Sequence, residues 1–276
     1  MVRCFVHRKL FTSISITGGK CWASCPFCRS RYLSSMVDAS KGLLDTVAEL
    51  VSRGVRGVLV SGGFTKDMAL PVEKSMEDLR KCRALLKAMT IHLGLHRNPL
   101  VIEEVSRIVD VVDFELVASA RDSQRLRGVE PRRYLETLER LAELRANVVP
   151  HVFLWTPWRS LSDVLAELSI VESFGFRRVT LLVLIGGGEP PRAIGEWLSR
   201  AASHFSGEIA LGCMRPWSCR RWLDEYAARE GLVDAIASPH PRALDYCSEL
   251  YDSCCSLPQS LLPYFEAKAY FSWGQS

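Results

Sequence analysis

The sequence is poor in side-chain amides and in lysine. Asn and Gln together number five in 276 residues, and Lys supplies 8 of the 35 basic residues, so Arg carries most of the positive charge. Few amides are typical of thermophilic proteins, although the usual enrichment in Lys and Glu is absent. The net charge of +4 is too small, for a chain of this length, to predict a nucleic-acid partner.

Long hydrophobic runs are absent as well. The longest apolar stretch, residues 179–185, has the length of a strand and is interrupted by Thr180, whereas a membrane-spanning helix needs about 18–20 apolar residues. The basic residues near the N-terminus are not followed by the apolar segment of a secretory signal. We therefore expect a cytoplasmic protein that does not bind the membrane.

Cysteine, in contrast, is abundant. A chain of this length can bury a large core and needs no disulfide to fold. In a reducing compartment, ten cysteines indicate metal ligands or catalysis before disulfides.

Short β-branched runs alternate with amphipathic helical patterns along most of the chain. The predicted strands are residues 12–17, 57–61, 90–95, 111–117, 148–154, 179–185, 208–214 and 233–238. The predicted helices are residues 41–52, 72–87, 100–108, 132–145, 162–174, 191–204 and 219–228. This alternation predicts an α/β fold with a parallel sheet, and eight strands fit a (βα)8 TIM-type barrel. A doubly wound open sheet is the alternative, but no Gly-x-Gly-x-x-Gly motif follows the first strand.

The last thirty residues break the alternation. We therefore predict a barrel over residues 1–246 and a C-terminal tail over 247–276 that packs on it and lies across one mouth. In such barrels, the chemistry belongs at the carboxyl ends of the strands and in the loops that follow them.

Three cysteines follow the first predicted strand at Cys-x3-Cys-x2-Cys spacing. Cys21, Cys25 and Cys28 can bind three irons of a [4Fe-4S] cluster and leave the fourth iron open to a small molecule. The alternative is a zinc site, which also uses closely spaced cysteines, but zinc normally takes a fourth ligand and no Cys or His follows until Cys82.

The triplet resembles the signature of the radical S-adenosylmethionine superfamily, Cys-x3-Cys-x-aromatic-Cys. The resemblance implies that the open iron binds the amino and carboxylate groups of S-adenosyl-L-methionine and that Phe27 stacks on its adenine. One electron then cleaves the sulfonium to a 5′-deoxyadenosyl radical, which abstracts a substrate hydrogen. The pair Gly62 and Gly63, after the second strand, matches a pair that presents backbone carbonyls to the amino group in that superfamily. A plain turn is the alternative for this pair.

Further segments resemble the biotin-synthase-like enzymes of this superfamily, and most closely a subunit of the two-protein, archaeal-type lipoyl synthase. The segments that carry the likeness are residues 11–18, 61–63, 91–95, 149–151, 211–216 and 254–255. The sequence departs from the family pattern at Phe64, Leu93 and Glu115. These departures concern contacts to the substrate and the adenosyl group more than the type of reaction.

The resemblance implies a transferase that inserts sulfur into an octanoyl chain on a carrier protein. Its implied partners are that octanoylated or lipoyl carrier, a second radical subunit, and a small-molecule electron donor or ferredoxin. The inserted sulfur comes from a second, auxiliary [4Fe-4S] cluster, for which we expect Cys213, Cys254 and Cys255 as ligands. Cys247 is a weaker candidate ligand. The alternative for Cys213 is that it is simply a small residue of the core.

Four more residues are candidates for binding S-adenosyl-L-methionine. His92 and His151 fall near strand ends, where each either bonds the cofactor or satisfies a core carbonyl. Glu115 is costly to bury alone, which favours a contact with the cofactor or with an Arg. Ile185 opens a glycine-bearing stretch that passes the adenine in related enzymes, with a flexible loop as the alternative.

Two other functions remain open on the sequence alone. One is a different radical reaction on a free small molecule, with structural late cysteines. The other is a non-catalytic scaffold that binds a cluster or zinc. Five arginines after the fourth predicted strand (121, 125, 127, 132 and 133) form either a solvated face or a docking surface for an acidic carrier domain.

Overall fold

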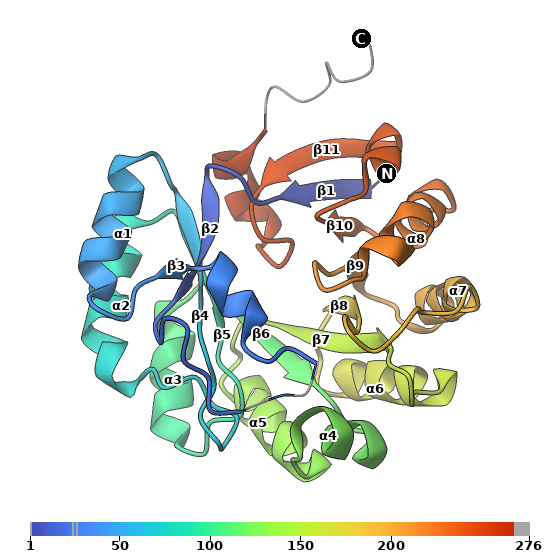
Figure 1. The fold of residues 1–276 in the computed structure, drawn as a ribbon, viewed down its shortest axis with the longest axis horizontal. Coiled ribbons are helices and arrows are strands. Elements are labelled where there is room, and N and C mark those ends of the chain that lie inside the picture. Colours follow the sequence, from blue (N-terminus) through green and yellow to red (C-terminus); the bar gives the residue numbers. More distant parts are fainter. Residues whose placement is uncertain (1, 24, 26, 268–276) are drawn as a thin grey trace.

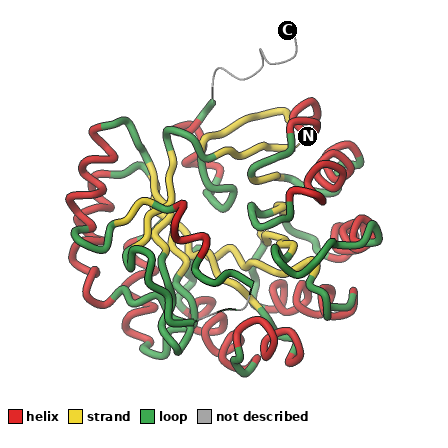
Figure 2. Tube along the Cα trace, viewed as in Figure 1, coloured by secondary structure: helices red, strands yellow, loops and turns green. Residues whose placement is uncertain are grey.

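Parallel strands follow one another around a curved sheet with helices on its outer side (Figures 1 and 2). The computed structural model describes residues 2–23, 25 and 27–267. The strands are β1 (Val2–Val6), β2 (Phe11–Ser15), β3 (Val37–Asp38), β4 (Gly57–Ser61), β5 (Ala88–His92), β6 (Val111–Leu116), β7 (Val148–Trp155), β8 (Arg178–Val183), β9 (Glu208–Leu211), β10 (Ala235–Ala237) and β11 (Cys247–Asp252).

Eight α-helices and four short 3₁₀ helices connect the strands in the described part of the chain. The α-helices are α1 (Leu43–Ser52), α2 (Met76–Leu85), α3 (Pro99–Ile108), α4 (Ala120–Arg127), α5 (Pro131–Glu143), α6 (Leu161–Ser173), α7 (Ile194–His204) and α8 (Trp217–Arg229). The 3₁₀ helices are η1 (Arg31–Ser35), η2 (Glu73–Ser75), η3 (Pro241–Tyr246) and η4 (Gln259–Phe265).

The strand order confirms the barrel-type α/β fold over the doubly wound alternative. Strands β4 to β10 are neighbours in sequence order, with no switch point between them, and β2 pairs with β4. In a closed eight-stranded barrel, β2 would also pair with β10. Here β1 takes that place and pairs with β10, and β11 pairs with the other edge of β1. Within the described residues the sheet therefore curls without closing through hydrogen bonds.

Two apolar layers hold this sheet. The larger lies between the strands and the helices and includes Val60, Ile91, Leu138 and Leu168. The smaller lies inside the barrel where strands begin, and its members include Phe11, Ala88, Val111 and Ala235. Because side chains alternate along a strand, the residues two and four positions further along point into the same lumen.

The eight predicted strands and seven predicted helices are all present, with ends that shift by a few residues. The sequence analysis missed β1, β3, β11 and α4. Strand β1 has no helix after it, so it lies outside the βα alternation. Helix α4 buries Leu126 as its only large apolar side chain, and it is fixed instead by the buried ion pair between Asp122 and Arg159.

The C-terminal segment lies across one end of the barrel, the end at which the strands begin. After β11, Cys254 and Leu257 join the inner layer, and Leu262 and Phe265 of η4 complete it. The Asp252 carboxylate accepts hydrogen bonds from the backbone N–H groups of residues 8, 9 and 10, at 2.7–2.9 Å. These bonds fasten the tail to the connection between β1 and β2.

The cysteines outside the candidate site fall into two groups. Cys4 of β1 and Cys247 of β11 form a disulfide, so the weaker expectation that Cys247 binds metal gives way to a link between the first and last strands. Cys82 and Cys219 are fully buried on helices, and burial raises the pKa of each thiol to about 12. No helix in the described part of the chain is both long and apolar enough to cross a bilayer.

Candidate active site

The loop that carries the cysteine triplet is fastened to the chain that leaves β4. The Trp22 N–H donates to the Phe64 carbonyl at 2.9 Å, and the Cys21 thiol approaches the same oxygen at 3.9 Å. Cys25 is buried, whereas Cys21 and Cys28 are half-buried. The three cysteines therefore lie on one loop at the carboxyl end of β2, where the sequence predicts the chemistry.

Gly63 allows this close contact between the two backbones. A Cβ atom at Gly63 would lie 1.9 Å from the Lys20 carbonyl oxygen and 2.5 Å from the Cα of Cys21. The Gly63 N–H donates to Thr17 Oγ1 at 2.6 Å. Independently of any ligand, the glycine pair is thus needed to seat the triplet loop, and a carbonyl contact from Gly62 or Gly63 to the cofactor stays a prediction.

Glu115 has an Arg partner. Its carboxylate accepts hydrogen bonds from Nε and Nη2 of Arg127, at 2.8 and 2.6 Å. Burial opposes the charge on Arg127, but the carboxylate more than offsets this effect, so the pKa of the guanidinium is raised. Burial raises the pKa of the Cys25 thiol, while the adjacent Arg127 acts to lower it. The pair therefore places a fixed cation beside a candidate cluster ligand.

His92 and His151 face each other inside the barrel, with ring centroids 6.1 Å apart in an edge-to-face arrangement. His92 Nδ1 lies 3.2 Å from Ser61 Oγ, and His151 Nδ1 lies 3.1 Å from the Val149 carbonyl. Burial lowers the pKa of both rings, that of His151 to about 4. Both rings are therefore neutral at pH 7, which suits them to hydrogen bonding rather than to ion pairing.

Phe27 lies against a second aromatic side chain at the mouth. Its ring centroid is 5.3 Å from that of Trp158. The Arg125 guanidinium lies 5.1 Å from the centroid of the same Trp158 ring. The turn after Ile185 approaches the Phe27 backbone: a Cβ at Gly186 would lie 3.5 Å from the Phe27 carbonyl oxygen. The structure thus brings together the aromatic residue and the glycine stretch that the resemblance assigns to the adenine.

A buried arginine fixes the loop after β9. Arg215 is 1% exposed and donates two hydrogen bonds to the Asp224 carboxylate, both at 3.0 Å, and one to the Ala237 carbonyl. Arg220 donates to the carbonyl of Cys213 on the same loop. Both arginines thereby hold the segment that presents Cys213.

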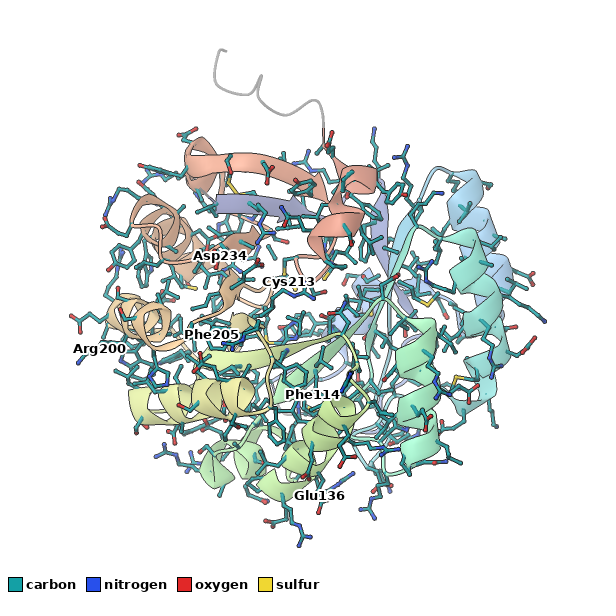
Figure 3. All side chains as sticks on the ribbon, turned by 180° about the vertical axis from the view of Figure 1, so that it is seen from behind. Phe114, Glu136, Arg200, Phe205, Cys213 and Asp234 are labelled. Carbon is teal, nitrogen blue, oxygen red and sulfur yellow. A yellow bond between two sulfur atoms is a disulfide. The ribbon has the colours of Figure 1, made fainter. Side chains whose placement is uncertain are left out.

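Figure 3 shows Cys213, on the loop that follows β9, near the centre of the ring of strands, and its side chain is exposed. The surrounding protein raises the pKa of its thiol, and the charge of Cys254 acts in the same direction. A hydrogen bond with Cys255 and burial together raise the pKa of Cys254 well above its ordinary value. Cys254 and Cys255 thus interact with each other and the charge of Cys254 reaches Cys213, while a cluster bound by all three stays a prediction.

Tyr32 of η1 is half-buried. Burial raises the pKa of its phenol, and Cys28 and Cys213 raise it further. No three His, Cys, Asp or Glu side chains in the described residues are grouped closely enough to hold a single metal ion. The ligands of a cluster bind different irons, so the cluster does not require such a group.

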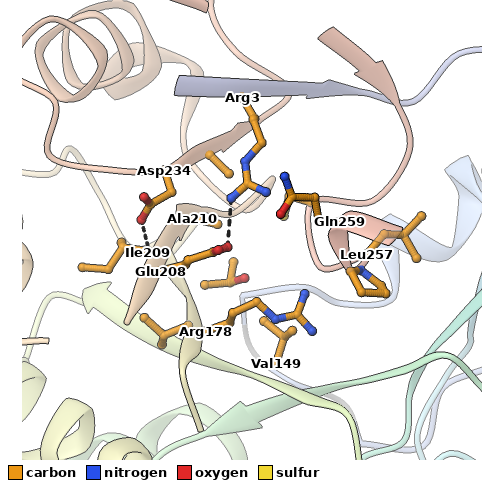
Figure 4. A pocket seen from close by; sticks show the side chains of 14 residues that line it. Arg3, Val149, Arg178, Glu208, Ile209, Ala210, Asp234, Leu257 and Gln259 are labelled. Carbon is orange, nitrogen blue, oxygen red and sulfur yellow. Dashed lines mark hydrogen bonds and ion pairs between the residues drawn. The ribbon is translucent and has the colours of Figure 1, made fainter. Parts of the chain in front are cut away.

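The opposite end of the barrel has a small pocket of about 90 Å³ (Figure 4). Arg3, Arg178 and Glu208 line it together with Cys255, and Arg3 forms an ion pair with Glu208 at 2.8 Å. Cys255 is half-buried there, whereas Cys254 is 8% exposed. This pocket reaches the candidate auxiliary ligands from the side away from the triplet.

The five arginines of the predicted docking surface all have partners. Arg121 pairs with Asp163 and Arg132 with Glu136, while Arg133 donates to two backbone carbonyls. Arg127 and Arg125 have the partners described above. The five arginines thus interact with other residues of this chain, and docking of an acidic carrier at this surface stays a prediction.

The sequence analysis overlooked one acidic residue and left one partner unidentified. Asp113 lies two positions before Glu115 on β6, so both acidic side chains share one face of the strand. That spacing within a strand was a usable signal. Arg127 was placed among the arginines of a possible docking surface, and its pairing with Glu115, twelve positions away, was not predicted.

Comparison with known proteins places the fold. No family model and no curated protein matches this sequence. Streptococcus suis SuiB bound to S-adenosylmethionine is 13% identical with a TM-score of 0.53, over 84% of this chain and 50% of that one. The chain thus spans about half the length of SuiB. The enzyme anSMEcpe with bound AdoMet and a peptide is 11% identical with a TM-score of 0.54, over 84% of this chain and 63% of that one.

A solved structure of an enzyme with a different activity is also similar to this chain. HMG-CoA lyase from Bacillus subtilis is 13% identical with a TM-score of 0.51, over 84% of this chain and 78% of that one. Identities this low show the fold alone. The chain therefore has an α/β barrel-type fold that proteins with bound S-adenosylmethionine share with an HMG-CoA lyase.

Proposed function

We propose that this chain is a radical S-adenosyl-L-methionine enzyme that holds a [4Fe-4S] cluster on Cys21, Cys25 and Cys28. The observation that carries the proposal is the seating of this triplet at the carboxyl end of β2, with Phe64 and Arg127 fixing its loop. When bound, the cluster supplies the electron that cleaves the sulfonium of S-adenosyl-L-methionine.

The chain's own residues have positioning roles in this proposal. Phe27 and the turn after Ile185 would together line the adenine site, since the turn already lies against the Phe27 backbone. His92 and His151 are neutral rings that would hydrogen-bond the ribose or the carboxylate. Glu115 acts through Arg127, which it holds beside Cys25. The curled sheet encloses the reacting groups and limits their contact with water.

More narrowly, we propose a lipoyl synthase subunit that inserts sulfur into a carrier-bound octanoyl chain. Its support is the presence of three further cysteines that carry no disulfide, Cys213, Cys254 and Cys255, of which Cys254 interacts with both of the others; they would hold a second, sacrificial cluster. The peptide seen in the anSMEcpe structure is compatible with a carrier protein as the substrate.

The test replaces Cys254 and Cys255 together with Ala. Iron should fall by about four atoms per chain, and sulfur transfer to an octanoylated carrier peptide should stop. Cleavage of S-adenosyl-L-methionine should continue, because the triplet is untouched. Unchanged iron in this variant would reject the lipoyl synthase assignment and leave a radical enzyme that acts on a free small molecule.

A matched variant tests the broader proposal. Cys21→Ala, Cys25→Ala or Cys28→Ala should each abolish 5′-deoxyadenosine production, whereas Cys82→Ala, at a cysteine buried on α2, should not. Full production by any of the triplet variants would show that the triplet does not hold the radical cluster, whereas no production by the parent chain would leave the scaffold function.

A further inference from the structure

The pocket at the end of the barrel where the strands begin contains an arginine without a carboxylate partner. Arg178, the first residue of β8, donates hydrogen bonds to the Ser256 carbonyl at 2.9 Å and to the side-chain oxygen of Asn147 at 2.7 Å. Both acceptors are neutral, and no described carboxylate forms an ion pair with this half-buried guanidinium. A charge that is withdrawn from water needs a counter-charge, so an anion is the partner that this site lacks.

A second arginine faces the same space. Figure 4 shows the side chains of Arg3, from β1, and Arg178, from β8, entering the pocket from opposite sides in that view. Burial lowers the pKa of the Arg178 guanidinium, although Glu208 acts to raise it. The carboxylates of the protein therefore leave part of this positive charge uncompensated.

Two carboxylates also line the pocket, and each is already engaged. Glu208 accepts a hydrogen bond from Nη2 of Arg3 at 2.8 Å. The Asp234 carboxylate accepts the backbone N–H of Ile209, also at 2.8 Å (Figure 4). The formal charges of the pocket thus balance in number but not in position. Nε of Arg178, and Nε and Nη1 of Arg3, donate no hydrogen bond to any described residue.

Small side chains leave room beside these donors. Ala210 of β9 and Ala235 of β10 line the pocket, and Gln259, the first residue of η4, faces it from the tail (Figure 4). The volume of about 90 Å³ equals that of about three water molecules. Such a space takes a small oxyanion, such as phosphate, sulfate or a small carboxylate, and it is too small for a nucleotide or an acyl chain.

We propose that this pocket binds one small oxyanion between Arg3, Arg178 and Gln259. Guanidinium groups suit oxyanions because they offer several N–H donors in one plane, and the side-chain amide adds a neutral donor. The bound anion would connect β1, β8 and the tail. Cys255 lines the same pocket, so its thiol would share this space with the anion. The site depends on neither cluster of the proposed function.

The experiment is equilibrium dialysis of the whole chain against isotopically labelled phosphate, sulfate and acetate, each in turn, at low ionic strength. At least one of them should bind saturably, with one anion per chain, and the order of affinities distinguishes a tetrahedral oxyanion from a carboxylate. Arg178→Gln should weaken this binding by about tenfold or more, because it removes a charge-assisted hydrogen bond to the anion.

Arg177→Gln is the matched control. It removes the same charge from the neighbouring residue, whose side chain is exposed and donates to Ser206 outside the pocket. Its affinity for the anion should equal that of the parent chain. Gln259→Glu is a second test variant, since it keeps the hydrogen bonds of Arg178 and adds a negative charge at the pocket. It should also weaken binding, and it decides the question if circular dichroism shows that Arg178→Gln does not fold.

Two outcomes would overturn the inference. If none of the three anions binds saturably to the parent chain, the pocket is not an anion site. If Arg178→Gln, or Gln259→Glu in its place, binds as tightly as Arg177→Gln, the anion binds elsewhere on the chain. Neither outcome touches the proposed function, which is tested by iron content and by 5′-deoxyadenosine production.

Discussion

Glu115 and Arg127 form a two-point ion pair, with hydrogen bonds of 2.8 and 2.6 Å, next to Cys25. Glu115 comes from β6 and Arg127 from the last turn of α4, a helix that the sequence pattern does not reveal. Paired hydrogen bonds of this kind fix the guanidinium in orientation as well as in position. The positive charge beside the triplet is thus a built feature of the fold.

We expect Arg127→Gln to make the reduction potential of the triplet cluster more negative. Removing a cation near a cluster disfavours the added electron, since net charge and hydrogen bonds set such potentials. A redox titration followed by electron paramagnetic resonance measures the change. Arg132→Gln is the control, because that side chain is 85% exposed and pairs only with Glu136. An equal potential in both variants would contradict the role given to Arg127.

Gly63→Ala should displace the triplet loop. The added Cβ would meet the Lys20 carbonyl at 1.9 Å, and relieving such a contact costs about 1–3 kcal/mol of the free energy of unfolding. Iron bound at the triplet should fall with it. Gly19→Ala, in the same loop, has no atom within 4 Å of the new Cβ and should behave like the parent chain. Urea unfolding and iron analysis test both variants, and full iron with normal stability in Gly63→Ala would disprove the packing argument.

Arg215→Met should destabilise the chain by about 3–5 kcal/mol, because it leaves the buried Asp224 carboxylate without its guanidinium partner. The double variant Arg215→Met with Asp224→Leu should recover part of that loss, since no buried charge then remains unpaired. Urea unfolding gives both free energies. If the double variant is less stable than Arg215→Met alone, the ion pair is not the source of the loss.

Acid should weaken the fold between about pH 6.5 and pH 4. Burial lowers the pKa of His151 from 6.5 to about 4, so over this range the unfolded chain takes up a proton that the folded chain does not. The free energy of unfolding therefore falls as the pH falls, by at most about 3 kcal/mol for this residue. His92 contributes in the same direction.

His151→Gln should flatten this dependence, as measured by urea unfolding at a series of pH values on chelator-treated protein that keeps its helical circular dichroism. His204→Gln, at a residue on the outer helix α7, is the control and should keep the parent slope. The same slope in His151→Gln as in the parent chain would show that His151 is not buried in its neutral form.

The sequence by itself determined the local features of this protein. The periods of two and about 3.6 residues placed the eight consecutive strands and their helices, because burial on one face imposes those periods on each segment separately. The spacing of Cys21, Cys25 and Cys28 placed three thiols on one loop, since ligands within eight residues need no distant partner. The glycines after β4 were likewise visible as a local motif.

Only the tertiary structure decided which distant residues meet. The order of strands put β1 between β10 and β11, so the barrel curls without direct pairing of β2 and β10, and the disulfide between Cys4 and Cys247 follows from that pairing. The tail joined the inner apolar layer through Cys254, Leu257 and Phe265 rather than only covering it. The pairing of Glu115 with Arg127 depends on how α4 packs, and side-chain spacing along the chain carries no record of that packing.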